Sequence, residues 1–508
     1  MSVKSIILVT IMFLAVGVSQ AQDLPEFEGE IKWSELFEVN RKVGEPSIIG
    51  NDGKYVYILR WVKKDHVIEK YDMRTLKLNA AAEVDLTYNK KPLLLQGQFM
   101  FGTKPMLYTS FYNKKTNINY SFVHKVNKSS LQISEPIPVG KVTVPKVKGI
   151  QSKLAMSMST SLGGYASRMI ISPNNELGFL SQIEYVDQEK KGETPKVKAL
   201  IGKLYDNNLE LLAESEYQLP YEQFTIFQTK LGDNGLVYMA GYQTSTETDN
   251  SGLLKKQYTE YGELEILVLE PETGDIETLE VGIGGEDEVK GFTFKIDEAD
   301  NIIISGMFGP ENGGITGAFY ARYNSLLKEQ GMNFVEFEED FITQGWSEKK
   351  KEKFDKQQRK NERKGEKKDK PVFYEYIVRD LITKPDGTST LLAEQYYMRV
   401  VTTTYTDSRG NMRTRTTYYY YYKDIIAVNF KADGELDWKT VVDKYQMSTN
   451  DGGYYSSFFT VLEGNDINII YNDRESKTVD TEGMTKQQKR NLARKTVGVR
   501  VVINDEGG

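Results

Sequence analysis

The chain has 508 residues, with 65 basic and 72 acidic side chains, no cysteine and only two histidines. Without cysteine there can be no disulfide, thiolate nucleophile, cysteine-ligated zinc or iron–sulfur cluster, and His66 and His124 alone cannot form a three-histidine metal site. The formal net charge of -7 argues against nucleic acid as the main partner, because phosphate binding requires a positive face.

The first residues have the layout of a secretory signal. Lys4 precedes an unbroken apolar stretch from Ile6 to Val18, and Ser19 and Ala21 supply the small residues of a cleavage site. A membrane span needs about 20 apolar residues, which is more than this stretch offers. We therefore expect residues 1–21 to be removed and the mature chain to be exported, to the periplasm or the extracellular space.

Two signals then alternate along the chain. The first is a turn rich in Asp, Asn and Gly followed by an alternating strand, and it recurs at 51–59, 102–108, 173–180, 232–240, 298–305, 384–392 and 463–470. The second is a strand, a polar turn and another strand, at 67–76, 121–131, 199–209, 266–276, 318–327, 425–436 and 497–508. Each unit thus predicts four antiparallel strands, and seven such units predict an all-β, seven-bladed β-propeller that fills residues 22–508 as a single domain.

The last unit ends in its turn and lacks a fourth strand. In the sixth unit the equivalent turn leads into Gly434-Glu-Leu-Asp-Trp-Lys439, and a similar sequence, Gly29-Glu-Ile-Lys-Trp-Ser34, follows the signal. We expect this amino-terminal strand to complete the last blade and close the ring, which would remove an open edge. The exported, cysteine-free repeat, rich in Tyr, Asn and Lys, resembles the uncharacterised secreted propeller proteins of Bacteroidota. That resemblance carries no catalytic residues over.

The long insertions all fall between the second and third strands of a unit or between units. They cover 138–166, 184–196, 244–262, 346–370, 402–418 and 474–495. In a propeller these connections open on one face, and long loops in a compact domain tend to be functional or disordered. The sequence therefore places the binding face at this end of the blades.

Two of these insertions, 346–370 and 484–496, share a basic sequence of good helix formers. Both contain Lys-Gln-Gln followed by two basic residues and Asn, starting at Lys356 and Lys486. We expect two short polar helices, in which Lys356, Arg359, Lys486 and Arg490 are candidate residues for docking an anionic partner. A solvated charge run is the alternative.

The insertion at 402–418 predicts a projecting hairpin, because Thr- and Tyr-rich flanks surround a turn at Asp407 to Asn411. Five tyrosines follow, and a period of two places Tyr418, Tyr420 and Tyr422 on one face and Tyr419 and Tyr421 on the other. Together with Tyr405 they form a candidate recognition platform for protein or carbohydrate. The alternative is a set of cross-strand ladders that only hold the hairpin together.

No catalytic residue can be assigned. There is no Gly-x-Ser-x-Gly elbow, no Walker-type phosphate loop and no calcium loop, and we expect neither a cofactor nor a metal. We predict an exported, non-enzymatic binding or scaffold protein that acts as a monomer or as a subunit of an envelope assembly. Its partner would be an envelope or extracellular protein or polysaccharide. We expect no transmembrane span in the mature chain. The alternative is a glycosidase or lyase with carboxylates in the central funnel, since such acids leave no linear signature.

Overall fold

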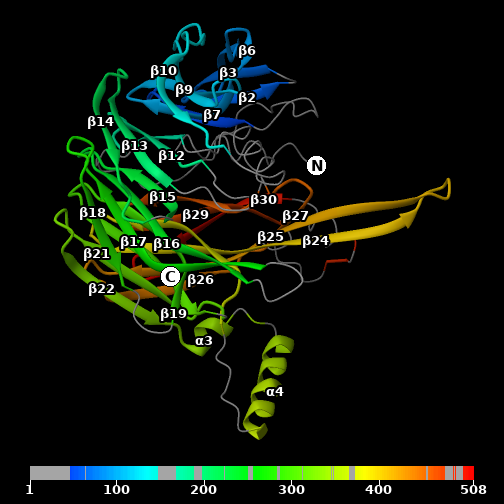
Figure 1. Ribbon diagram of the computed structural model, residues 1–508. Helices are drawn as coiled ribbons and strands as arrows, with labels where there is room; N and C mark the ends of the chain where they lie inside the picture. The colour runs from blue at the N-terminus through cyan, green and yellow to red at the C-terminus, as the bar shows by residue number, and fades with distance from the viewer. Residues whose placement is uncertain are drawn as a thin grey trace. The chain divides into compact units, whose positions relative to one another are not determined.

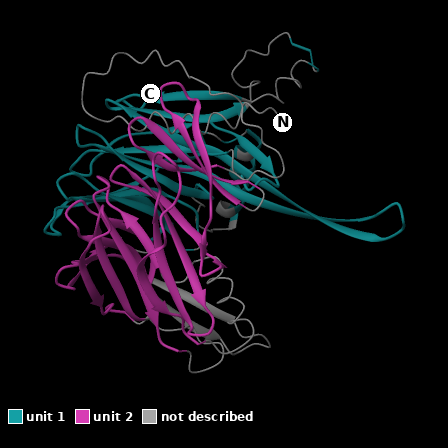
Figure 2. Cartoon of the chain, turned by 90° about the horizontal axis from the view of Figure 1, so that it is seen from above, with its two compact units in different colours: residues 1–9, 283–508 teal, residues 10–282 magenta. Residues whose placement is uncertain are grey.

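A computed structural model describes residues 46–62, 65–146, 167–187, 197–221, 224–249, 256–282, 287–311, 313–344, 346, 348–364, 372–453, 456–474, 484–485, 487 and 496–508. The predicted signal, the predicted closing strand near Trp33 and the basic residues Lys486 and Arg490 lie outside this part of the chain. The chain divides into two compact units, residues 10–282 and residues 283–508 with 1–9 (Figure 2). The prediction of a single domain stays a prediction.

The 10–282 unit contains, among its described residues, four antiparallel sheets of four strands and one small hairpin (Figure 1). Within each sheet the strands are hydrogen-bonded in chain order. The first two sheets and the hairpin comprise β1 (Ser47–Asn51), β2 (Tyr55–Val62), β3 (Asp65–Asp72), β4 (Leu78–Val84), β5 (Thr87–Tyr88), β6 (Lys91–Pro92), β7 (Leu94–Phe101), β8 (Lys104–Asn113), β9 (Ile118–Lys125) and β10 (Ile137–Thr143). The next two comprise β11 (Ser167–Ile171), β12 (Leu177–Tyr185), β13 (Val197–Asp206), β14 (Leu211–Tyr217), β15 (Phe224–Leu231), β16 (Val237–Asp249), β17 (Lys256–Leu269) and β18 (Ile276–Val281).

The described part of the 283–508 unit contains sheets of four, five and three strands and two helices. The four-stranded sheet comprises β19 (Asp287–Ile296), β20 (Ile302–Pro310), β21 (Gly317–Tyr323) and β22 (Glu329–Glu336), and the helices are α3 (Glu339–Thr343) and α4 (Glu348–Lys364). The five-stranded sheet comprises β23 (Tyr376–Thr383), β24 (Ser389–Thr406), β25 (Met412–Phe430), β26 (Leu436–Val442) and β27 (Gln446–Thr449), and the last comprises β28 (Phe458–Glu463), β29 (Asp466–Arg474) and β30 (Thr496–Ile503). The all-β expectation is confirmed, and the helix α4 lies inside the first basic insertion.

Consecutive sheets within each unit pack face to face. In the 283–508 unit, Leu391 of β24 joins a core cluster with Ile303 of β20, whereas its neighbour Leu392 joins another with Ile469 of β29. Adjacent residues of a strand point to opposite faces, so β24 is covered on both sides. This explains why the second and third strands of the sheets are apolar over long runs, as in β20, where only the last residue is exposed.

The short turns lie where the Asp, Asn and Gly signals predict them. Between β19 and β20, Asp297 Oδ1 accepts hydrogen bonds from the backbone N–H of Ala299 at 3.0 Å and of Asn301 at 2.9 Å. Asn324 Oδ1 makes the equivalent pair of bonds after β21, to Leu326 and Lys328. A side chain that bonds its own backbone two and four residues on makes the turn a local property of the sequence.

Two of the predicted insertions differ from the structure. In 244–262, the residues up to Asp249 and from Lys256 onward are paired parts of β16 and β17. Residues 138–143 were expected to begin a long loop, but they form most of β10, the fourth strand of its sheet. Pro138 and Gly140 flank a β-bulge, and a Cβ on Gly140 would lie 2.4 Å from Gln182 Oε1. Here the glycine permits close packing against the next sheet, so its presence does not mark a loop.

Candidate binding site at the β24–β25 hairpin

The longest hairpin of the described chain is formed by β24 and β25, which pair from Ser389 and Phe430 out to Thr406 and Met412. It extends beyond the other strands of its own sheet (Figure 1). The tip closes with a hydrogen bond from Asp407 N–H to the Asn411 carbonyl at 2.9 Å, and Gly410 adopts a φ of +80° there. The hairpin is longer than the predicted 402–418, because Tyr and Thr continue the strand pattern inward.

Asp407 organises the tip. Its Oδ1 accepts hydrogen bonds from the backbone N–H groups of Arg409 and Asn411, and Arg413 Nε donates to its Oδ2 at 3.0 Å. These contacts, with the Asn411 N–H contributing most, lower the pKa of the Asp407 carboxyl below its ordinary value. The only acidic group in residues 398–420 is therefore already engaged within the turn.

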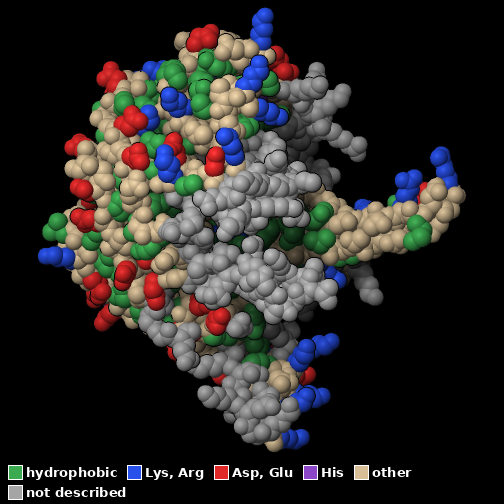
Figure 3. All heavy atoms as spheres, in the orientation of Figure 1, with side chains coloured by type: hydrophobic (Ala, Val, Ile, Leu, Met, Phe, Trp, Pro, Cys, Tyr) green, Lys and Arg blue, Asp and Glu red, His purple; other side chains and the backbone are tan. Residues whose placement is uncertain are grey.

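The outer hairpin, defined here as residues 398–420, has two chemically different faces. Paired residues of an antiparallel ladder share a face, and faces alternate along each strand. The uncharged face carries Met398, Val400, Thr402, Thr404, Thr406, Met412, Thr414, Thr416, Tyr418 and Tyr420. The arginine face carries Arg399, Val401, Thr403, Tyr405, Arg413, Arg415, Thr417 and Tyr419. Figure 3 shows Lys and Arg atoms gathered near the end of this projection.

The tyrosines predicted as one platform fall into two groups. Tyr421 stacks on Tyr397 with ring centroids 4.6 Å apart, and Tyr422 lies 4.7 Å from Tyr396, so these two form cross-strand ladders at the root of the hairpin. Tyr418 and Tyr405 remain 41% and 52% exposed on the outer hairpin. Tyr419 and Tyr420 are partly covered and pair with Thr449 and Ser448 of β27. The cross-strand ladder is thus observed for Tyr421 and Tyr422, and the recognition platform stays a prediction.

A buried polar cluster lies beneath the root. Glu394 of β24 is fully buried, and its Oε2 lies 2.7 Å from a terminal nitrogen of Arg379 and accepts a hydrogen bond from Ser457 Oγ at 2.7 Å. The Nζ of Lys444, also fully buried, lies 2.7 Å from Glu394 Oε1 as an ion pair without hydrogen-bond alignment. Lys444 Nζ also donates to Gln446 Oε1 at 2.8 Å. Together these contacts tie β23, β24 and β27 to one another.

Burial and a neighbouring charge act in opposite directions on the pKa of Lys444. Desolvation lowers the pKa of Lys444, and the neighbouring Glu394 opposes that shift. Although perturbed groups often mark active sites, Lys444 and Glu394 have no exposed side-chain surface and cannot meet a substrate. The cluster therefore positions the hairpin. Arg379 extends this role, since its guanidinium carbon lies 5.8 Å and 5.7 Å from the ring centroids of Tyr396 and Tyr422.

This cluster was not predicted from the sequence. The available signal was Glu394 itself, a carboxylate directly after the buried run Leu391-Leu392-Ala393. A charge in such a position is almost never fully buried unless it is paired. Its partners could not be named from the sequence, because they lie on β23 and in the segment between β26 and β27.

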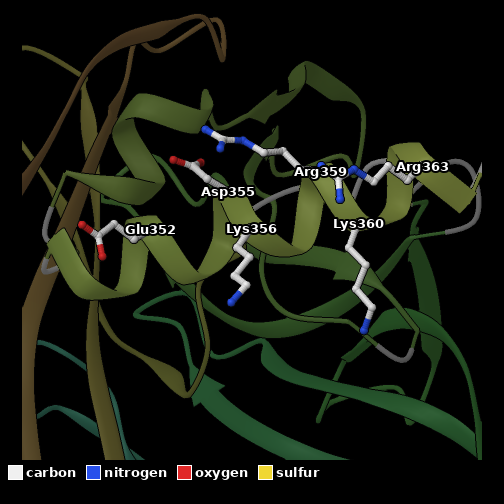
Figure 4. A pocket seen from close by; sticks show the side chains of 6 residues that line it. All are labelled: Glu352, Asp355, Lys356, Arg359, Lys360 and Arg363. Carbon is white, nitrogen blue, oxygen red and sulfur yellow. The ribbon is translucent and has the colours of Figure 1, made fainter.

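The basic helix α4 forms a second surface. Glu352, Asp355, Lys356, Arg359, Lys360 and Arg363 line a shallow pocket along it (Figure 4). Their spacing of three and four residues places them on one stripe of the helix, and Figure 4 shows Lys356 and Lys360 pointing to the same side. The helix is attached through Phe354, whose ring contacts Trp346 with centroids 5.3 Å apart. Trp346 in turn packs on the core cluster between the sheet that begins with β19 and the sheet that begins with β23.

The two histidines occupy structural positions. His124 is buried, with Nε2 3.0 Å from Thr109 Oγ1 and Nδ1 3.2 Å from the Ser134 carbonyl. The His66 ring forms a T-shaped contact with Trp61, with centroids 4.3 Å apart. Burial lowers the pKa of both imidazoles. Among the described residues there is no group of three or more His, Asp or Glu side chains that could hold a metal ion.

No protein-family model matches the sequence, and no curated protein matches it. Among solved structures, the chain is similar to the Dos1 propeller, with 7% identity over 85% of this chain and 78% of that one and a TM-score of 0.36. It is also similar to prolyl oligopeptidase B from Galerina marginata, with 7% identity over 87% of this chain and 56% of that one and a TM-score of 0.36. An α-L-arabinanase from Penicillium chrysogenum, complexed with arabinobiose, matches at 8% identity over 70% of this chain and 89% of that one, with a TM-score of 0.31. At these TM-scores the likenesses establish neither a shared fold nor a shared activity.

None of the helices in the described ranges is long and apolar enough to cross a membrane. The glycosidase or lyase alternative stays a prediction. Its two acids would come from different copies of the sequence repeat.

Proposed function

We propose that this chain is an exported, non-enzymatic binding or scaffold protein whose binding element is the β24–β25 hairpin. The observation that carries the proposal is the contrast between the root and the outer part of the hairpin. The root is held by buried ion pairs and stacked tyrosines, whereas the outer part exposes Met398, Val400, Tyr405 and Tyr418. A rigid support that presents exposed Tyr and Arg suits recognition, since these residues give large contact area at a small entropic cost.

The proposal includes the arrangement of the sheets. We infer that they are blades of a seven-bladed propeller, with residues 29–34 completing the three-stranded sheet of β28, β29 and β30. The face-to-face packing of consecutive sheets within each unit supports this arrangement. It would place the β24–β25 connection and α4 at the same end of the blades. The β24–β25 connection follows the second strand of its blade, and α4 follows β22, the fourth strand of the blade before it. The exported location rests on the predicted signal at residues 1–21 and is part of the proposal.

The function is tested by shortening the hairpin. Replacing residues 400–418 with Asn-Gly joins Arg399 to Tyr419 through a tight turn that suits a two-residue hairpin. The parent chain, immobilised, should retain a defined partner from an envelope extract, and the shortened chain should not. Equal retention of the same partner by both chains would remove the hairpin from the proposed function.

A further inference from the structure

The outer hairpin has an open backbone edge along β24. Strand β23 pairs with β24 only as far as Gln395, and Tyr396 N–H donates to the Glu375 carbonyl at 2.7 Å. In the described part of the chain no strand covers that side from Tyr397 to Thr406. The opposite edge is shorter, since β27 covers β25 from Tyr419 to Tyr422. Strand β27 also shows that this hairpin accepts an added antiparallel strand of four residues.

The direction of the backbone groups can be read from the flanking contacts. Asn450 N–H donates to the Tyr418 carbonyl at 3.0 Å, and Tyr418 N–H donates to Asn450 Oδ1 at 2.9 Å, so both backbone groups of Tyr418 point away from β24. Tyr418 and its partner Val400 are therefore a non-hydrogen-bonded pair of the ladder. Such pairs alternate, so the N–H and C=O groups of Val400, Thr402 and Thr404 point into the open edge.

This edge lacks the features that normally protect an exposed strand. Such strands are usually short or carry Pro, Lys or inward charges, but Tyr397 to Thr406 reads Tyr-Met-Arg-Val-Val-Thr-Thr-Thr-Tyr-Thr, with one charge and no proline. Residues of this kind favour strand formation. The edge can therefore pair with another strand.

The positive charge of the outer hairpin indicates which kind of strand would pair with this edge. Residues 398–420 contain four arginines, Arg399, Arg409, Arg413 and Arg415, against Asp407 alone. Three of the arginines share the arginine face. Arg413 is paired with Asp407, whereas no acidic group among the described residues forms a salt bridge with Arg399 or Arg415. If two copies of this chain paired antiparallel through this edge, their arginine faces would lie on the same side of one sheet and repel.

We propose that the open edge of β24 binds an extended, acidic segment of a partner protein by strand addition. The segment pairs with the outward backbone groups of Val400, Thr402 and Thr404 and places its carboxylates on the arginine face, beside Arg399, Arg413 and Arg415. Main-chain bonds then supply affinity, and the alternating side chains supply specificity. This inference rests on the proposed binding function and names its mode and the chemistry of its partner.

The probe is a fluorescent octapeptide of alternating Glu and Val, followed by fluorescence anisotropy on the full chain. The Thr402→Pro variant removes an outward N–H and leaves the backbone bonds to β25 in place. Both this variant and Thr402→Ala lose the γ-methyl and the hydroxyl that lies 3.3 Å from Thr416 Oγ1, but Thr402→Ala keeps the N–H. Thr416 is the residue paired with Thr402 on β25, so Thr416→Pro makes the same change on the opposite edge. We expect the Thr402→Pro variant to bind at least about tenfold more weakly, and the Thr402→Ala and Thr416→Pro variants to bind like the parent.

Two further measurements complete the test. An octapeptide of alternating Lys and Val should not bind, and equal binding of both peptides would overturn the acidic partner. Equal binding by the Thr402→Pro and Thr416→Pro variants would overturn the edge. Dimerisation of the parent that Thr402→Pro abolishes would show that a second copy occupies the edge and would overturn the acidic partner. If the chain shortened at 400–418 loses its envelope partner while Thr402→Pro retains it, the proposed function stands and strand addition at this edge is refuted.

Discussion

At the scale of single residues, the carboxylate of Glu394 has the largest structural role at the candidate site. It forms ion pairs with both Arg379 and the fully buried Lys444. A buried ion pair contributes little by itself, because desolvation offsets the attraction, but removing one partner leaves an uncompensated buried charge. Glu394 thus fixes the geometry of the hairpin root.

We expect Glu394→Gln to lower the free energy of unfolding by about 3 to 5 kcal/mol. The same change at Glu435, whose side chain is 68% exposed in an ion pair with Lys431, should cost about 1 kcal/mol or less. Urea unfolding followed by circular dichroism measures both. Similar losses for the two variants would show that the buried cluster does not hold the root.

At the scale of elements, the β24–β25 hairpin joins a supporting part and a presenting part. The supporting tyrosines Tyr421 and Tyr422 make ring contacts across the ladder, and Tyr418 is exposed on the uncharged face. Aromatic pairs of this kind contribute about 0.5 to 1.5 kcal/mol beyond the burial of their area. Replacing each of the five consecutive tyrosines should therefore lower the stability of the fold by a different amount.

The double variant Tyr421→Ser with Tyr422→Ser should lower the melting temperature by several degrees, because both cross-strand ring contacts are lost. The matched double variant Tyr418→Ser with Tyr419→Ser should melt within a few degrees of the parent. Differential scanning calorimetry distinguishes the two. A larger loss at Tyr418 and Tyr419 would contradict the division into supporting and presenting residues.

The parts of this account that could be predicted from the sequence are local. Asp297 and Asn324 define their turns through hydrogen bonds that span four residues, and alternation along Tyr418 to Tyr422 gives the faces of the hairpin. The buried contact of Glu394 with Lys444 could not be predicted, because it depends on how β24 and the segment before β27 fold together. For the same reason Gly140 was assigned to a loop, although it lies in a strand against the next sheet.

At the scale of the whole molecule, stability rests on many buried tyrosines in a chain without disulfides. Burial raises the pKa of Tyr205 and Tyr471 from the ordinary value of 10.0 to about 12. A group whose pKa is higher in the folded state contributes stability that is fully present below the unfolded value and is lost as the pH rises through the folded value.

We therefore expect the chain to lose stability as the pH rises from 10.0 to about 12. Absorbance at about 295 nm reports tyrosinate, and circular dichroism reports the fold; the buried tyrosines should ionise together with unfolding. Complete ionisation near the ordinary pKa with an intact β spectrum would show that these phenols are accessible to solvent.

The central claim is that the outer hairpin is the binding element of this chain, and partner retention measured per mole of folded bait tests it most directly. The parent and the chain with residues 400–418 replaced by Asn-Gly should melt within a few degrees of each other, because the removed side chains are mostly exposed. The account predicts that the shortened chain loses the partner retained by the parent. Undiminished retention by a folded, shortened chain would contradict it.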